Sequence, residues 1–246
     1  MYKIKYQKAV KILLISNIFT IIVLLVVIVK EKYPSRIHNT LFPSKKLSSY
    51  SDNSFYEYYT ITYPLFKGQK NIVLFGNSLT ACVDWKDLLN RNDVATRGIS
   101  GDISSGLLAR MNYIIDLKPK ICFIEGGIND IKENIPNDTI IKNLTSIIDT
   151  FLKCDIKPVI TTVTLLAQKY DAENVNEINI QIKHLNQQIL NLAKNKRFIV
   201  IDLNHYVSNK NFLNSEYVIK DGLHFSDKTY MIWKQEIEKI LLQEGI

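Results

Sequence analysis

Short apolar runs alternate with segments of helical pattern from residue 70 to the C-terminus, and this alternation limits what the chain can fold into. The runs cover residues 71–75, 94–98, 121–125, 158–163 and 198–203. Strands that are apolar along their whole length and separated by helices are typical of a parallel sheet buried on both faces. The pattern therefore predicts a three-layer α/β/α domain with about five parallel strands.

Two of the intervening segments have clear helical spacing. In the first, apolar residues recur every three or four positions and form one stripe, made of Val175, Ile178, Ile182, Leu185, Ile189 and Leu192. In the second, Ser226-Asp227 is typical of a helix start, and Tyr230, Trp233 and Ile237 follow at helical spacing. Each helix is expected to turn its apolar stripe toward the sheet.

The N-terminal part of the chain contains a different kind of segment, an apolar run over residues 12–29. Its 18 residues carry no charge, and as a helix they would extend ~27 Å, close to the roughly 30 Å of a bilayer core. A cleaved signal peptide is the alternative, but its apolar region is usually only about 7–15 residues long and ends at small residues. We expect a retained transmembrane anchor.

The basic balance of the chain belongs to this anchor. The net charge is +7, and six lysines against one glutamate give residues 1–33 a net charge of +5, which leaves +2 for the rest. Nucleic-acid binders gather basic residues on a binding face. Here the basic excess flanks the apolar segment instead, so a nucleic-acid partner is not expected. Because a short tail with four lysines crosses a membrane poorly, we expect a single-pass protein with its folded domain outside the cytoplasm.

The chain accordingly divides into four parts: a short basic cytoplasmic tail (residues 1–11), the membrane helix (12–29), a linker with an aromatic extension (30–69) and the folded domain (70–246). Seven aromatic residues lie between Tyr50 and Phe66. They could pack on the domain, stack on sugar rings or lie at the bilayer interface. The three cysteines include no C-x-x-C pair, which argues against a zinc knuckle or a disulfide framework. Cys122, within an apolar run, is expected to be a buried thiol.

Polar residues follow the first three strands, at the edge where parallel sheets bind ligands. Gly76 and Ser78 follow the first strand. A tight turn at Gly76 would place the hydroxyl group of Ser78 at the edge of the sheet. Gly101 follows the second strand and allows a backbone N–H to approach a ligand oxygen closely. Asn129 follows the third strand, and its amide can either cap a turn or donate a hydrogen bond into the cleft.

Asp221 and His224 lie just before the last helix, three residues apart. Across one turn, this spacing can bring the carboxylate to Nδ1 of the imidazole and leave Nε2 free as a base. His205 has Asp202 at the same spacing and is the main alternative, whereas His38 and His184 fit less well. A nucleophile, possible oxyanion donors and an acid–base pair together indicate an acyl-transfer site.

The order of the blocks GNSL, RGISGD, GIND and DGLH resembles that of the SGNH hydrolases, the GDSL-type esterases and lipases. The resemblance implies a flavodoxin-like fold in which Ser78 and His224 are catalytic, with Asp221 as the third member of the triad. It also implies an oxyanion hole formed by Ser78, Gly101 and Asn129. No metal and no organic cofactor are implied.

The resemblance covers about residues 71–242 and is strongest to the branch that contains platelet-activating-factor acetylhydrolase-like esterases. Two positions depart from the family pattern. Asn77 stands where the family usually has Asp, and Thr96 stands where an Asn before Arg-Gly is common. Because Asn can accept similar hydrogen bonds, we expect reduced rather than lost activity from the first change.

The predicted function is hydrolysis of acyl esters, preferably short acetyl-type esters, by a membrane-anchored serine esterase. The ester substrate would be an acylated glycan or a small lipid ester. Three alternatives stay open: an O-acyltransferase that acts on a glycan, a lysophospholipase or lipase, and a non-catalytic glycan-binding protein that has kept the fold.

Overall fold

The computed structural model describes residues 11, 13–24, 26, 49–170, 172, 174–196 and 198–246. The chain divides into two compact units, Met1–Lys46 and Leu47–Ile246. In the first unit, residues 13–24 are helical. Within the described ranges, no helix has the length and apolar character that a membrane crossing requires. The membrane helix predicted over residues 12–29, the tail 1–11 and residues 30–48 of the linker lie partly or wholly outside the described residues. The anchor is therefore not confirmed and stays a prediction.

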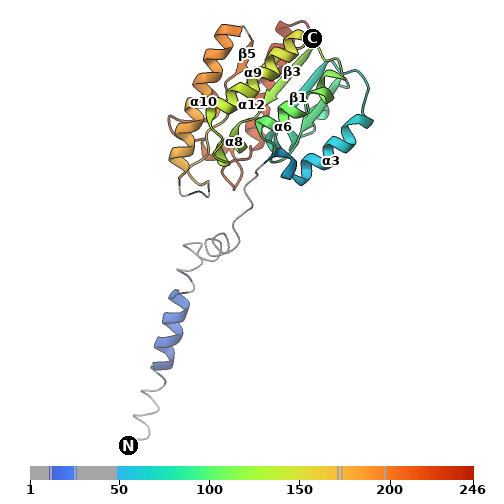
Figure 1. The fold of residues 1–246 in the computed structure, drawn as a ribbon. Helices are drawn as coiled ribbons and strands as arrows, with labels where there is room; N and C mark the ends of the chain where they lie inside the picture. The colour runs from blue at the N-terminus through green and yellow to red at the C-terminus, as the bar shows by residue number, and fades with distance from the viewer. Residues whose placement is uncertain are drawn as a thin grey trace, which may run out of the picture. The chain divides into compact units, whose positions relative to one another are not determined.

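The second unit is built on a five-stranded parallel sheet (Figure 1). Its order is β2-β1-β3-β4-β5, with β1 in contact with both β2 and β3. The strands are β1 (Ile72–Gly76), β2 (Val94–Gly98), β3 (Ile121–Glu125), β4 (Lys157–Thr161) and β5 (Ile199–Ile201). The apolar runs predicted all five strands and their parallel arrangement, although β4 and β5 end before the apolar residues that follow them.

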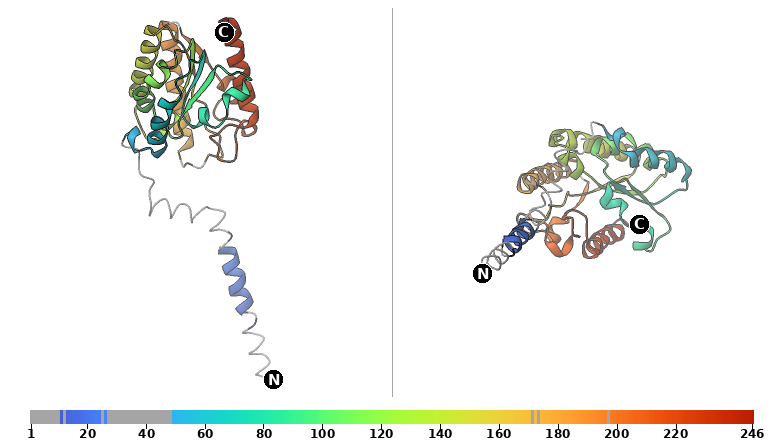
Figure 2. Two further views of the ribbon diagram at one scale, coloured as in Figure 1. Left: turned by 90° about the vertical axis from the view of Figure 1, so that its right-hand side faces the viewer. Right: turned by 90° about the horizontal axis from the view of Figure 1, so that it is seen from below.

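Helices cover both faces of the sheet and complete three layers (Figure 2). The helices of this unit are α3 (Ser54–Thr62), α4 (Ser78–Ala81), α5 (Trp85–Leu88), α6 (Ser104–Ala109), α7 (Asn112–Ile115), α8 (Ile128–Lys132), α9 (Asn137–Lys153), α10 (Val175–Lys196), α11 (Asn204–Val207) and α12 (Asp227–Gln243). Single 3-10 turns lie at η1 (Tyr50–Asp52), η2 (Tyr63–Leu65) and η3 (Ser215–Tyr217).

Alternate residues of each strand enter two separate cores, because successive side chains point to opposite faces of a sheet. Val73 and Phe75 of β1 belong to one core together with residues of α6, α7, α9 and α10, and the apolar stripe of α10 enters this core as predicted. Ile72 and Leu74 face the other side, where they pack with α5 and α12. Cys122 lies fully buried in the first core, as expected.

Residues 49–66 belong to the second unit and pack against the loop after β2. The Tyr63 hydroxyl donates to the carbonyl of Gly98 at 3.0 Å, and the side-chain amide of Asn53 donates to the carbonyl of Ser100 at 2.9 Å. The guanidinium of Arg97 lies 4.7 Å from the centre of the Tyr63 ring. Other apolar side chains of this extension stay exposed, namely Phe55, Tyr58, Ile61, Leu65 and Phe66.

Candidate active site

The turn between β1 and α4 presents Ser78 at the carboxyl end of the sheet. Gly76 ends the strand in a space without room for a side chain, since a Cβ there would lie 2.3 Å from Thr80 Oγ1. Asn77 caps the helix, because its Oδ1 accepts a hydrogen bond from the backbone N–H of Leu79 at 2.9 Å. Ser78 is therefore the first residue of α4, with a hydroxyl that is only partly buried.

His224 and Asp221 extend from Ser78 in one continuous chain of hydrogen bonds. Nε2 of His224 lies 2.9 Å from Oγ of Ser78, and Nδ1 lies 2.6 Å from Oδ2 of Asp221. The other oxygen of Asp221 accepts the backbone N–H groups of Leu223 and His224 at 2.9 and 3.0 Å. The structure thus brings together the three residues that the sequence predicted as a triad.

The Asp221–His224 turn depends on a glycine between the two. Gly222 has φ +78°, a left-handed conformation that glycine adopts without strain. A Cβ at this position would also lie 2.7 Å from the backbone nitrogen of Tyr170. The backbone thereby folds back and places the carboxylate of Asp221 against Nδ1 of His224, whose Nε2 contacts Ser78.

The electrostatics of Asp221 suit an acid that orients a histidine. Partial burial alone would raise the pKa of Asp221, but hydrogen bonds from Leu223 and His224 outweigh it and lower the pKa below its usual value. An ionised carboxylate accepts the Nδ1–H of His224. Nε2 is then left as the acceptor for the Ser78 hydroxyl.

The three predicted oxyanion donors lie at the ends of neighbouring strands. The backbone N–H of Ser78 belongs to the first turn of α4, where such groups have no partner within the helix. Gly101 has φ +75° in the loop after β2. Asn129 lies in α8 and donates one amide hydrogen to the carbonyl of Asp102 at 2.9 Å. An NH₂ group has two hydrogens, so this contact fixes the amide and leaves the second hydrogen for a ligand.

A buried ion pair, which sequence reasoning missed, holds these loops together. Arg110 is fully buried and donates to the Asp102 carboxylate at 2.8 Å. It also donates to the carbonyls of Gly76 and Arg97, both at 2.8 Å, and its guanidinium lies 4.5 Å from the centre of the Phe75 ring. One side chain thereby connects the ends of β1 and β2. The signal available in the sequence was an arginine directly after the apolar residues 107–109.

Asp130 has a comparable supporting role on the other side of Asn129. Its carboxylate accepts the hydroxyl of Ser104 at 2.5 Å and the backbone N–H of the same residue at 2.9 Å. Asn143 of α9 donates to that hydroxyl at 2.9 Å. Burial raises the pKa of Asp130 to about 6, even though the hydrogen bonds from Ser104 act to lower it. Asp130 therefore ties α8 to the start of α6 rather than facing the triad.

The other histidines lie apart from these contacts. His205 is exposed on α11, and its ring lies against Tyr206. Asp202 accepts hydrogen bonds from Thr162 and Asn204. His184 is exposed on α10, and His38 lies outside the described residues.

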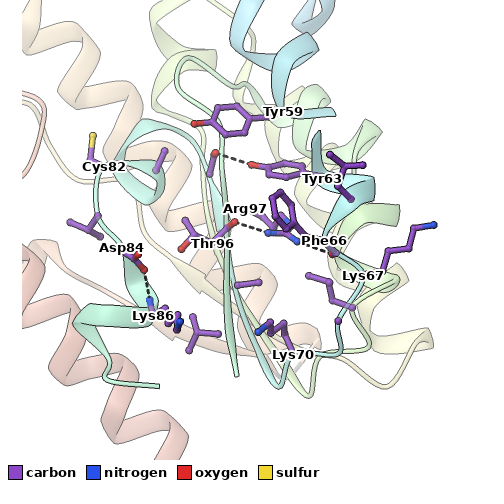
Figure 3. A pocket seen from close by; sticks show the side chains of 18 residues that line it. Tyr59, Tyr63, Phe66, Lys67, Lys70, Cys82, Asp84, Lys86, Thr96 and Arg97 are labelled. Atoms are coloured by element: carbon purple, nitrogen blue, oxygen red, sulfur yellow. Dashed lines mark hydrogen bonds between the residues drawn. The ribbon is translucent and has the colours of Figure 1, made fainter. Parts of the chain in front are cut away.

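A cavity of about 840 Å³ lies beside β2, between that strand and residues 59–70 (Figure 3). Tyr59, Tyr63, Phe66 and Arg97 line it, and Ala81 and Cys82 of the segment after Ser78 form part of its wall. The triad residues do not line it. Among the residues that the structure describes, no group of three or more His, Cys, Asp and Glu side chains could hold a metal ion.

Comparison with solved structures finds the same fold in several hydrolases. A GDSL-like lipase from Bacteroides thetaiotaomicron is 25% identical, with a TM-score of 0.69, and the match covers 77% of this chain and 98% of that one. A platelet-activating-factor-like protein from Streptococcus pneumonia is 19% identical, with a TM-score of 0.63, over 85% of this chain and 98% of that one. A structure described as an acetyl xylan esterase is 20% identical, with a TM-score of 0.59, over 69% of this chain and 98% of that one.

None of the curated proteins matches the chain. A family model does, over residues 74–232, which include Ser78, Gly101, Asn129, Asp221 and His224. This match spans well over half of the chain, and it agrees with the resemblance that the four sequence blocks indicated. The chain belongs to the GDSL-like lipase/acylhydrolase family.

Proposed function

We propose that this protein is a serine esterase that hydrolyses short-chain, acetyl-type carboxylic esters through an acyl-enzyme. The observation that carries the proposal is the continuous hydrogen-bonded chain from Ser78 Oγ through His224 to Asp221. A serine hydroxyl is a weak nucleophile by itself, and an adjacent base oriented by a third group is what activates it.

In the proposed mechanism, Ser78 Oγ attacks the ester carbonyl carbon while Nε2 of His224 takes the hydroxyl proton. The carboxylate of Asp221 stabilises the imidazolium that forms. The N–H groups of Ser78, Gly101 and Asn129 stabilise the negative charge on the carbonyl oxygen. The intermediate then expels the alcohol, which takes the proton from His224. Water, activated by the same histidine, hydrolyses the acyl-enzyme and regenerates Ser78.

The preference for short acyl groups has two supports. The sequence from residue 70 onward contains no long insertion that could build a deep acyl tunnel. One structure with the same fold is described as an acetyl xylan esterase, which acts on short acyl esters of a carbohydrate. We therefore infer that the substrate is an acetylated carbohydrate rather than a long-chain lipid.

Hydrolysis of p-nitrophenyl esters with acyl chains from C2 to C12 tests this proposal. We expect kcat/KM to be highest for C2 to C4 and to fall at least about tenfold by C8, because the sequence has no long insertion that would build a tunnel for the longer chain. A maximum at C8 to C12 would contradict the acetylesterase proposal and favour a lipase or lysophospholipase. Transfer of the acetyl group to an added sugar, in preference to water, would favour the O-acyltransferase.

We also infer that the segment over residues 12–29 holds this activity at a membrane. The inference rests on the length and apolar character of that segment. The full chain should sediment with the membrane fraction and resist extraction by high salt, and a chain that lacks residues 1–30 should stay in the supernatant. Sedimentation of both chains, or of neither, would contradict the anchor.

A further inference from the structure

The nucleophile turn is held by a buried carboxylate that takes no part in the proposed mechanism. β1 and β3 are neighbours, with Phe75 opposite Ile124, so Glu125 at the end of β3 lies beside the turn that carries Ser78. The side-chain amide of Asn77 donates to Oε1 of Glu125 at 2.9 Å. The backbone N–H of Asn77 and the hydroxyl of Thr80 both donate to Oε2 at 3.4 Å.

The residues that make these contacts flank Ser78 in the sequence. Asn77 precedes the nucleophile and Thr80 follows it by two residues, and both bond the same carboxylate. Glu125 is only 3% exposed and Asn77 is 0% exposed, so water does not compete for these hydrogen bonds. Asn77 uses its other side-chain atom, Oδ1, to cap α4. Its amide therefore joins the carboxylate of Glu125 to the first turn of the helix that presents Ser78.

The charges explain why an amide stands at position 77. Burial raises the pKa of Glu125 to about 7, although hydrogen bonds from Asn77 and Thr80 favour its ionised form. Asp, which the family usually has at position 77, could also cap the helix. As a carboxylate, however, it could not donate to Glu125, and above about pH 7, where Glu125 is ionised, it would place a second negative charge against the first.

We propose that Glu125 is a positioning residue for the nucleophile, and that Asn77 and Glu125 form one coupled unit. In this unit the buried carboxylate lies at the end of β3, and the amide at position 77 supplies the donor that the carboxylate needs. The inference rests on the proposed esterase activity, since it concerns the placement of Ser78 for attack. It also gives the departure at position 77 a physical reason: in this chain Asn77 supports activity, in contrast to the reduced activity expected from the sequence alone.

Exchanging the carboxylate and the amide between positions 77 and 125 tests whether the two side chains act together. Asn77→Asp alone sets two carboxylates against each other and should lower kcat roughly 10- to 100-fold, with KM nearly unchanged, because a small displacement of the nucleophile is costly. Glu125→Gln alone keeps an acceptor for Asn77 and should have a smaller effect. In Asn77→Asp/Glu125→Gln, the new glutamine donates to the new aspartate, and kcat should return to within about threefold of Glu125→Gln.

The pH dependence separates positioning from general support of the fold. At low pH, one carboxyl of the Asn77→Asp variant binds a proton and can donate to the other. The ratio of its kcat to that of Glu125→Gln, which has no carboxyl at either position, should therefore be higher at pH 5.5 than at pH 8.5. The same ratio for the double variant should change less, because the glutamine donates to the single carboxylate and favours its ionised form. The wild type is measured at both pH values beside them, because its own Glu125 titrates in this range. The other ionisable groups that face this network are Asp102, its partner Arg110, and Tyr230 of α12, and they are the same in all four proteins.

The experiment measures kcat, KM and the rate at which a fluorophosphonate labels Ser78, for the full-length wild type, both single variants and the double variant. Labelling needs no knowledge of the natural ester. Asn191 is an exposed amide on α10, so Asn191→Asp serves as the matched control for the change from amide to carboxylate.

If the wild type neither hydrolyses esters nor becomes labelled, the proposed function is wrong. If the wild type is labelled but the double variant keeps the full loss of Asn77→Asp, the coupling is wrong. If Asn77→Asp does not fold, recovery of folding and labelling in the double variant supports the coupling, and failure of both overturns it.

Discussion

Replacement of Ser78 or His224 by alanine is expected to lower kcat for ester hydrolysis by about 10⁴-fold or more, because either change removes the nucleophile or its base from the triad. Ser78→Ala removes the atom that attacks the carbonyl carbon. His224→Ala removes the acceptor that lies 2.9 Å from that atom. Without this acceptor the hydroxyl keeps its proton and stays a weak nucleophile at neutral pH.

The two losses do not add. Ser78 and His224 act in one proton transfer, so the variant that lacks both should be about as active as either single variant. Asp221→Asn should cost a similar factor, because the amide could then favour the wrong tautomer of His224. The measurement is kcat/KM with p-nitrophenyl acetate, together with a thermal unfolding curve for each variant.

His205→Ala is the matched control for these variants. Like His224, this histidine follows an aspartate by three residues, but it lies exposed on α11 against Tyr206. Its removal should leave kcat/KM unchanged. A wild-type kcat/KM in Ser78→Ala, or a large loss of kcat/KM in His205→Ala, would contradict the assignment of the triad.

The apolar runs were enough to predict the sheet, because a strand buried on both faces has to be apolar along its length. The helical stripe of α10 was readable for a similar reason, since its spacing of three and four residues matches one face of a helix. The ends of β4 and β5 were less readable. Apolar residues continue beyond both strands as buried loop, for example Val163 and Leu203, and hydrophobicity alone does not separate a buried loop from a strand.

The functional residues of the site were predictable to the extent that they are local in sequence. Asp221 and His224 meet across a single turn, so their spacing carried the information. Arg110 and Glu125 were missed because their partners are remote along the chain. Arg110 donates to the carbonyl of Gly76, 34 residues away, and Glu125 accepts from Asn77, 48 residues away. Such pairings follow from the order of strands in the sheet, which the pattern of apolar runs does not contain.

Asn129→Ala should have the next largest effect, a loss of about 10²- to 10³-fold in kcat with KM nearly unchanged. The amide of Asn129 is held in place by its hydrogen bond to the carbonyl of Asp102 at 2.9 Å, and this bond leaves its second hydrogen for a substrate oxygen. A donor fixed before the reaction costs no reorganisation when charge develops on the carbonyl oxygen. Its contribution therefore falls on the transition state rather than on substrate binding.

Asn129→Asp sharpens this test, because the aspartate has nearly the same shape but cannot donate when ionised. If the amide serves only to tie α8 to the loop after β2, alanine and aspartate should both act mainly through stability, and the loss of kcat should follow the loss of Tm. If the amide stabilises the oxyanion, aspartate should be worse than alanine, since it sets a negative charge against the developing one. The backbone N–H groups of Ser78 and Gly101 remain in both variants, so some turnover should persist. Equal kcat in the wild type and Asn129→Ala would show that these two N–H groups carry the oxyanion alone.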